Sequence, residues 1–470
     1  MAPAQPDLAP TGAPGGQPTD EPVPGRLPIS RLVPSRGRAD VRPLDGRQVV
    51  WVDMDRGDEV ARLSSDTCAV LEAAATTAFV ERLPFVVTIS TGGVDIVEGV
   101  SALHAWGRVT AAVSRLSGIV PTFAVVDGPA VSGPALLLGL TDFVIMTEGS
   151  SAFVNGPVMV RQYTGVDIAV DELGGAANHA RQTGIPAVVA ADRAEATDAV
   201  ADLLAYLPDH LDDEPPRWVT SDPADRSCPG AGAQIPETST GSYDVRAVAT
   251  EIVDEDSLLE VRDRWAANLV TAFATIDGRP VGIVANQPMQ LAGTLDIPAS
   301  QKAARFVALC DAFNLPLVTL VDTPGFYPGK DLEWRGMIRH GAQLVYAYAR
   351  ATVPRISVIL RKSYGGAYIV MDSKTMGNDL CLAWPWAELA VMGAGQAAAI
   401  LRRRATDEER AEFERDYTER LLNPYVAADR GLVDAVIDPA ETRIEIAAAL
   451  EVLRDKRETL GGRKHGNSPL

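Results

Sequence analysis

The sequence has few basic residues and no long apolar run, and each shortage excludes a class of protein. Lysine and arginine together number 43 against 62 acidic residues, giving a formal net charge of -19. A general nucleic-acid surface needs clustered positive charge, so we do not expect one. No window approaches the roughly 18 apolar residues of a membrane span, and the N-terminus lacks the charged start and apolar core of a signal peptide. We therefore expect a cytoplasmic protein that binds neither nucleic acid nor a membrane.

Cysteine is also scarce, and its four positions stand far apart in the chain: Cys68, Cys228, Cys310 and Cys381. No pair has the spacing of a zinc site or a redox motif, so no metal site is predicted. We expect all four to be buried, reduced thiols. The phosphate-binding loop with its lysine is missing, and so is the Gly-x-Gly-x-x-Gly pattern after a strand, which argues against a nucleotide site.

Composition divides the chain into four parts. Residues 1–40 are rich in Pro, Gly and Ala without an apolar period, which predicts a disordered tail. Residues 209–242 are acidic, Pro-rich and aperiodic, and we interpret them as a linker. The blocks on either side, 41–208 and 243–470, are predicted to be an N-terminal and a C-terminal domain.

The two predicted domains repeat each other. Residues 84–90 and 316–322 are short apolar, β-branched runs, each followed by a Gly-containing turn, and each is typical of a buried strand. A helical stretch follows in both blocks. A second strand then starts at Pro121, 37 positions after the first start, and at Pro354, 38 positions after the other. The pattern predicts a duplicated domain of the α/β class.

Each second strand leads into a turn of small residues that opens a helix. The turns contain Ser132 and Gly133 in the first block and Gly365, Gly366 and Ala367 in the second. The first turn of a helix has N–H groups without intrahelical partners, and glycine lets a ligand approach the backbone closely. We interpret the turns as oxyanion holes for an enolate or ureido oxygen, in which a donor is worth roughly a hundred- to a thousandfold in rate. The alternative is that these glycines serve only tight helix–sheet packing.

Longer stretches of the sequence resemble a known family. Residues 243–470 closely resemble the C-terminal domain of the carboxyltransferase (β) subunit of biotin-dependent acyl-CoA carboxylases of the acetyl-/propionyl-CoA type. The stretches that carry this resemblance are GIVANQPM at 282–289, VDTPGF at 321–326, RKSYGGAY at 361–368, and residues 383–385, 390–394 and 464–470. The N-terminal half resembles the family more faintly, through residues 128–129, 141–143 and 172–176.

This resemblance implies an architecture and a set of partners. It implies two tandem crotonase-like (ββα-spiral) domains, assembled as a homo-oligomer of the hexamer-of-dimers type, with each active site between the N domain of one subunit and the C domain of its partner. It also implies an acyl-CoA substrate and a separate biotin carboxylase/biotin carboxyl carrier subunit, with no cofactor bound covalently here. The biotin nitrogen can take the α-proton itself, so no side-chain base is required. This agrees with the isolated positions of His104, His179 and His340.

The resemblance also assigns roles to positions. The implied oxyanion donors are Gly366, Ala367, Ser132 and Gly133, and the implied substrate-binding residues are Gly92, Gly93, Gly365 and Ile369. Propionyl-preferring members of the family have Asp at the position of Ile369. An apolar residue there favours acetyl-CoA or a longer acyl chain.

The N-terminal half departs from the family pattern at three places. Pro134 stands where the family has Ala, and proline has no N–H to donate. Asp95 replaces an arginine in a loop that lies beside the thioester site in the family, where an acid would repel coenzyme A phosphates. A Gly-rich segment expected near residues 53–65 is replaced by an acidic one.

Three functions are therefore kept open. The first is a carboxyltransferase subunit that moves a carboxyl group from a partner's carboxybiotin to the α-carbon of an acyl-CoA through paired oxyanion holes. The second is a biotin-independent decarboxylase of a malonyl-type thioester, which needs only one hole. The third is a non-catalytic β-like subunit that serves assembly or regulation.

Overall fold

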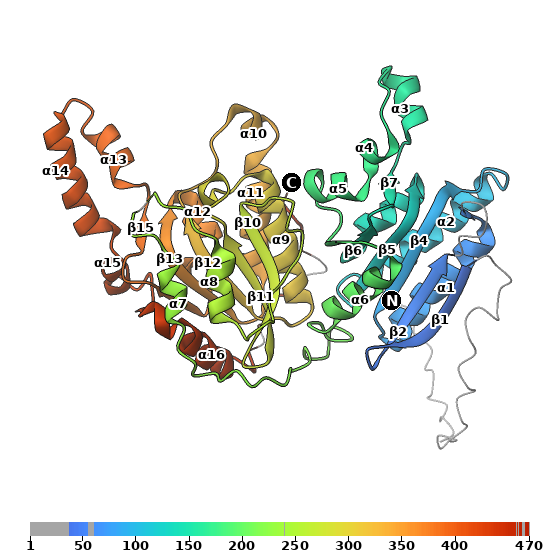
Figure 1. Ribbon diagram of the computed structural model, residues 1–470, viewed down its shortest axis with the longest axis horizontal. Coiled ribbons are helices and arrows are strands. Elements are labelled where there is room, and N and C mark those ends of the chain that lie inside the picture. Colours follow the sequence, from blue (N-terminus) through green and yellow to red (C-terminus); the bar gives the residue numbers. More distant parts are fainter. Residues whose placement is uncertain are drawn as a thin grey trace, which may run out of the picture.

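The computed structural model describes residues 37–54, 61–238, 240–456, 458, 460–462 and 466–469, and Figure 1 shows them as two α/β domains side by side. Most of the tail predicted for residues 1–40 lies outside the described residues. Strand β1 begins at Gly37, four residues before the predicted boundary at residue 41, and pairs with β2 over its full length. Ala39 is completely buried in that strand, so this end of the predicted tail belongs to the domain.

The N-terminal domain is built on a sheet with the strand order β1-β2-β4-β5-β6-β8, to which β3 and β7 add at the edges of β4 and β5. Its elements are β1 (Gly37–Leu44), β2 (Arg47–Met54), β3 (Ala61–Leu63), α1 (Ser65–Glu81), β4 (Phe85–Val94), α2 (Val100–Ser114), β5 (Thr122–Val131), the short helix η2 (Gly133–Gly139), β6 (Phe143–Thr147), β7 (Ser151–Phe153), α3 (Pro157–Thr164), α4 (Val170–Gly174), α5 (Ala176–Gln182), β8 (Val188–Ala190) and α6 (Arg193–Leu204).

The C-terminal domain has a second sheet with the order β16-β14-β13-β12-β11-β10-β9, and β15 pairs with β13. Its elements are α7 (Pro229–Ala233), α8 (Val245–Ile252), β9 (Leu259–Glu260), β10 (Leu269–Ile276), β11 (Arg279–Asn286), η3 (Leu291–Gly293), α9 (Ile297–Ala312), β12 (Leu317–Thr323), α10 (Lys330–Trp334), α11 (Met337–Arg350), β13 (Arg355–Tyr364), α12 (Gly365–Val370), η4 (Lys374–Met376), β14 (Leu380–Ala383), β15 (Glu388–Ala390), α13 (Ala394–Leu401), α14 (Asp407–Tyr417), the π-helix η5 (Thr418–Leu422), α15 (Pro424–Asp429), β16 (Ala435–Val436), η6 (Pro439–Glu441) and α16 (Thr442–Val452).

The predicted duplication is confirmed by the details of strand pairing. The parallel strands β2, β4, β5 and β6 in one half correspond to β11, β12, β13 and β14 in the other. The β4–β5 pairing shifts register between Ile89 and Thr91, and the β12–β13 pairing shifts at the same place, between Val321 and Thr323. Such a shift bends a strand and redirects its end, so the two turns that follow are presented in the same way.

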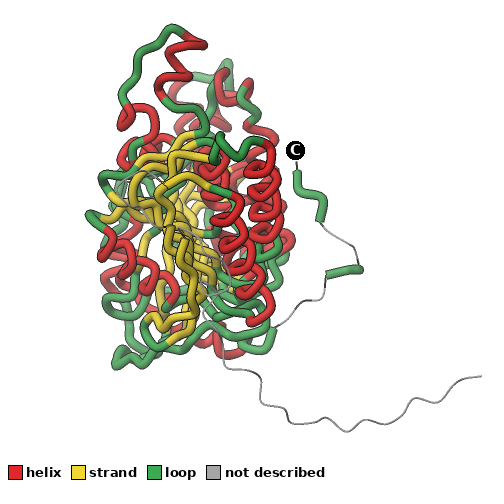
Figure 2. Tube along the Cα trace, turned by 90° about the vertical axis from the view of Figure 1, so that its right-hand side faces the viewer, coloured by secondary structure: helices red, strands yellow, loops and turns green. Residues whose placement is uncertain are grey.

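The two sheets share one apolar core. Helices α1 and α2 cover one face of the N-terminal sheet, and α9 and α11 lie between its other face and the C-terminal sheet. The rings of Phe143 in β6 and Phe273 in β10 approach with centroids 6.0 Å apart, and Phe306 of α9 packs on Phe273 at 5.1 Å. Figure 2 shows the strands in the middle with helices on either side. The two domains are therefore fixed against each other.

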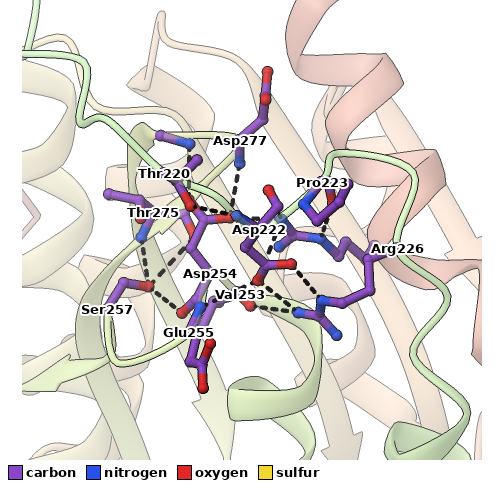
Figure 3. A network of polar contacts seen from close by, with 12 residues as sticks. Thr220, Asp222, Pro223, Arg226, Val253, Asp254, Glu255, Ser257, Thr275 and Asp277 are labelled. Carbon is purple, nitrogen blue, oxygen red and sulfur yellow. Dashed lines mark hydrogen bonds and ion pairs between the residues drawn. The ribbon is translucent and has the colours of Figure 1, made fainter.

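The predicted linker, residues 209–242, is a packed connection rather than a free one. Arg226 forms an ion pair with Asp222 at 2.6 Å, and it also donates to the carbonyl oxygen of Val253 at 2.9 Å. Arg443 of α16 is completely buried and pairs with Asp254 at 2.6 Å. Figure 3 shows Asp254 in one polar network with Asp222 and Arg226. Buried ionic groups are tolerated only when they are paired in this way, so the network fixes the connection to the C-terminal domain.

The structure also describes the four cysteines and the lengths of the helices. All four cysteines are free and buried, as predicted. Among the described ranges, no helix is long and apolar enough to cross a membrane.

Candidate active site

The C-terminal turn lies where β13 enters α12. Gly365 has a φ of 61°, and a Cβ at this position would lie 3.2 Å from the carbonyl oxygen of Val391, so only glycine fits without strain. Gly366 follows on the surface and Ala367 is buried beneath it. Both belong to the first turn of α12, whose N–H groups have no intrahelical acceptor. The predicted donors therefore stand at an accessible turn.

A cavity of about 630 Å³ opens beside this turn. Its lining is mostly apolar and comes from α12, β15 and residues 417–432: Gly365, Gly366, Tyr368, Ile369, Leu389, Ala390, Val391, Tyr417, Leu421, Val426, Ala427, Arg430 and Leu432. Arg430 is the single charged residue of this lining. Three of the predicted residues, Gly365, Gly366 and Ile369, thus meet at one cavity, and the 38% exposed Ile369 leaves part of its side chain free for a ligand.

A buried polar cluster that sequence reasoning missed holds the strand leading to this turn. The carboxylate of Asp322 accepts hydrogen bonds from Tyr243 Oη at 2.8 Å, Arg361 Nε at 3.0 Å and the backbone N–H of Lys362 at 3.1 Å. Burial raises the pKa of the Asp322 carboxyl above its usual range, and Arg361 opposes that shift. The cluster fixes β13 three residues before Gly365.

The described residues of the N-terminal half, 37–54 and 61–208, form no such cluster. Ser90 takes the place of Asp322 at the register shift, and its buried Oγ has no hydrogen-bond partner among the described residues. Gly128 takes the place of Arg361 on the neighbouring strand. In the sequence, the C-terminal half has Asp322 and Arg361 near the ends of two adjacent strands, whereas the N-terminal half has an uncharged residue at both positions. This difference is the signal that indicates the cluster.

The N-terminal turn keeps the shape of its counterpart but has fewer donors. Ser132 has a φ of 65°, close to that of Gly365. Its N–H donates to the carbonyl oxygen of Phe153 at 2.9 Å, because the β5–β7 pairing continues into the turn. The backbone N–H of Ser132 is therefore used within the sheet and is not free to donate to a ligand. Pro134 has no N–H, so the N–H of Gly133 is the backbone donor that remains in this turn.

The predicted substrate-binding glycines of β4 lie next to this turn. Gly93 is buried with a φ of 112°, and its N–H donates to Thr91 Oγ1 at 3.1 Å. A Cβ at Gly93 would lie 3.7 Å from the Cβ of Ser132, so the ends of β4 and β5 meet here, with Gly92 exposed beside them. Asp95 accepts a hydrogen bond from the N–H of Val97 at 2.9 Å, which gives it a local role in the loop.

The structure does not bring the two turns into one cavity. Every residue that lines the C-terminal cavity falls between 365 and 432, and Gly133 and Gly366 belong to separate sheets. A single chain therefore has two separate turns: one with two backbone donors beside a cavity, and one with a single backbone donor at the start of η2.

Comparisons with known proteins agree with this duplicated arrangement. A family model described as the carboxyl transferase domain matches residues 40–468. The propionyl-CoA carboxylase beta chain of Saccharopolyspora erythraea is 45% identical over 406 residues, covering 82% of this chain and 74% of the relative. The methylmalonyl-CoA decarboxylase subunit alpha of Veillonella parvula is 39% identical over 428 residues, covering 91% and 84%.

The solved structures give the same result for the fold. Transcarboxylase 12S, solved as a hexamer with methylmalonyl-CoA bound, matches with a TM-score of 0.90 and 42% identity, over 92% of this chain and 85% of that one. The predicted fold of two tandem crotonase-like domains is therefore confirmed, and so is the predicted activity class, acyl-CoA carboxyl transfer. This chain belongs to the carboxyl transferase domain family.

Proposed function

We propose that this acyl-CoA carboxyltransferase holds the ureido oxygen of carboxybiotin at the C-terminal turn and the thioester oxygen of acyl-CoA at the N-terminal turn. The observation that carries the proposal is the repetition of one strand–turn–helix geometry, with φ of 61° at Gly365 and 65° at Ser132. The biotin is carried by a separate partner protein. The apolar cavity beside Gly366 is the space in which its ring system meets the acyl group of the substrate.

The reaction needs two oxygen atoms to take up negative charge. The carboxyl–nitrogen bond of carboxybiotin breaks first, which releases CO2 and leaves its electron pair delocalised over the ureido nitrogen and oxygen. That nitrogen then takes a proton from the α-carbon of the acyl group, and the electron pair of the C–H bond delocalises onto the thioester oxygen. The α-carbon of this enolate forms the new bond to the carbon of CO2. The N–H groups of Gly366 and Ala367 donate to one oxygen and that of Gly133 to the other, in fixed directions that need no reorganisation.

The wall of the cavity bears on the choice of acyl group. Ile369 projects from α12 with an exposed apolar side chain, at the position where the family resemblance implies an acid in propionyl-preferring members. An apolar wall gives a hydrocarbon chain a surface on which to bury. This supports acetyl-CoA or a longer acyl-CoA as the substrate, in preference to propionyl-CoA.

Exposed apolar residues around both turns support a shared site between two copies. Ile96, Val97 and Val100 follow β4 near the N-terminal turn with exposed fractions of 81%, 85% and 76%. Beside the C-terminal cavity, Val391 and Tyr425 are 76% and 56% exposed. Apolar patches of this kind mark interaction surfaces. A dimer that placed the N-terminal turn of one copy against the C-terminal cavity of the other would cover both.

The test uses the purified full chain with malonyl-CoA as carboxyl donor and free biotin as acceptor, which runs the transfer in reverse. The proposal expects acetyl-CoA to appear only when biotin is present. Acetyl-CoA and CO2 without biotin would select the decarboxylase instead, the second candidate supported by the Veillonella relative. No turnover with malonyl-CoA, methylmalonyl-CoA or a longer-chain analogue would leave a non-catalytic subunit as the function.

A further inference from the structure

The N-terminal turn lacks a backbone donor that its C-terminal counterpart has. Gly133 and Pro134 occupy the positions of Gly366 and Ala367, 233 residues apart in each case. The proline removes one N–H, and the N–H of Ser132 is already used within the sheet. An enolate oxygen at this turn would meet one backbone donor. Losing one such donor typically costs a hundred- to a thousandfold in rate, roughly, so a replacement is needed if the site works.

Trp106 of α2 places an indole N–H against this turn. A Cβ at Gly133 would lie 3.1 Å from Trp106 Nε1, 3.4 Å from Cδ1 and 3.7 Å from Cε2. The edge of the ring that carries the N–H is therefore the part closest to the turn. Gly133 itself permits this approach, because any larger residue would push the indole away.

The indole N–H is an unused donor. Trp106 as a residue is 8% exposed, and its Nε1 forms no hydrogen bond in the part of the chain that the structure describes, although the atom is not fully enclosed. Four other tryptophans, Trp51, Trp218, Trp384 and Trp386, donate their indole N–H to a protein oxygen, whereas Trp265 and Trp334, both more exposed than Trp106, do not within the described residues. A largely buried tryptophan normally finds a partner for this group. An indole N–H left open beside a ligand turn is therefore available to a ligand oxygen.

The other half of the molecule offers a natural comparison. There the ring that packs against the turn is Phe326, which lies 3.4 Å from a Cβ placed at Gly366 and has no polar atom. The turn with two backbone donors thus has an apolar ring beside it, and the turn with one backbone donor has a ring with an N–H.

We propose that the indole N–H of Trp106 is the second oxyanion donor of the N-terminal turn, replacing the N–H that Pro134 lacks. The inference rests on the proposed carboxyltransferase function. With Gly133 it forms a mixed hole, one backbone donor and one side-chain donor, for the thioester oxygen as that oxygen becomes an enolate. The indole N–H of Trp106 then compensates for the N–H that Pro134 lacks, and the N-terminal site is retained.

The experiment is a double-mutant cycle on carboxyl transfer from malonyl-CoA to free biotin. Trp106→Phe keeps an aromatic ring but removes the N–H, and we expect kcat to fall about a hundredfold while KM for malonyl-CoA stays within about twofold. Pro134→Ala restores a backbone N–H and should recover most of that loss in the Trp106→Phe background, while changing the unaltered protein little. Benzothienylalanine at position 106, which replaces the N–H by sulfur at nearly the same shape, should behave like phenylalanine.

Trp51→Phe is the matched control. This residue is a buried tryptophan of the same domain, and its Nε1 already donates to Thr88 Oγ1 at 3.1 Å. It should lower the melting temperature but leave turnover per folded enzyme unchanged. Wild-type turnover in Trp106→Phe, or a loss that Pro134→Ala does not rescue, would overturn this inference alone. Absence of transfer in the unaltered chain would overturn the proposed function and this inference with it.

Discussion

At the scale of single residues, the two turns differ by groups as small as one N–H. Gly366 and Gly133 follow residues with nearly equal φ, yet the next residue is alanine in one case and proline in the other. Because an oxyanion hole acts through donors that are already in place, a single missing hydrogen has a large effect on rate and little effect on fold. The most direct tests therefore compare two variants with different substitutions at the same position, one that removes the N–H and one that keeps it.

The first prediction compares two substitutions of Gly366. Gly366→Pro removes the N–H and should lower kcat for carboxyl transfer by roughly 10²–10³-fold. Gly366→Ala keeps the N–H, and its Cβ would lie 3.4 Å from the Phe326 ring, an ordinary contact. It should retain most of the activity. Proline is accepted in the first turn of a helix, so both variants should fold. Equal activity of the two variants would contradict the donor role.

The second prediction concerns Ile369 and acyl selectivity. Ile369→Asp should shift the ratio of kcat/KM for propionyl-CoA over acetyl-CoA upward, because it creates the residue found in propionyl-preferring relatives. Ile369→Val keeps an apolar wall and serves as the control, with little change in the ratio. Competition assays with a partner biotin carrier would measure it. A strong preference of the unaltered protein for propionyl-CoA would contradict the proposal.

The residues of the site could be predicted from the sequence only in part. Gly365, Gly366 and Ile369 lie together as predicted, because they are neighbours on one short helix after a strand. The backbone N–H of Ser132 is used by the pairing of β5 with β7, which the spacing of residues does not reveal. Trp106 was missed, since 27 residues separate it from Gly133 and only the packing of α2 on the turn brings them together.

At the scale of elements, the buried strands were the most predictable part. The apolar runs that begin near Pro84 and Pro316 form β4 and β12, because fully buried parallel strands need continuous apolar sequence. β1 was not predicted, because its sequence is polar and its pairing with β2 depends on the turn at Asp45 and Gly46. The packing of residues 209–242 was not predicted, because charged residues hold this segment in place and their partners lie far along the chain.

The third prediction tests the network that anchors this connection. Arg443→Met should leave Asp254 without its buried cationic partner and lower the free energy of unfolding by about 3–5 kcal/mol. Arg454→Met removes a 61% exposed arginine that pairs with Glu451 at 3.4 Å, and should cost about 1 kcal/mol or less. Denaturant melts followed by fluorescence would compare the two variants. Similar losses in both would mean that the buried network contributes little.

At the scale of the whole molecule, the duplication separates the two turns. The shared apolar core fixes the domains, so a hinge motion that would bring Gly133 and Gly366 of one chain together is not available without breaking the contacts of Phe143, Phe273 and Phe306. A carboxyl group cannot be transferred between distant half-sites. The proposed function therefore requires a second copy that completes each site.

The last prediction tests this requirement by mixing two inactive variants. Gly366→Pro damages only the C-terminal turn, and Gly133→Pro removes the remaining backbone donor of the N-terminal turn. In a hybrid dimer, one site combines two intact turns and the other combines two damaged ones. Random co-assembly of co-expressed variants should therefore recover about a quarter of the wild-type specific activity, because half of the dimers are hybrids and half of their sites are intact. If each chain works alone, the mixture will show only the average of the two inactive parents.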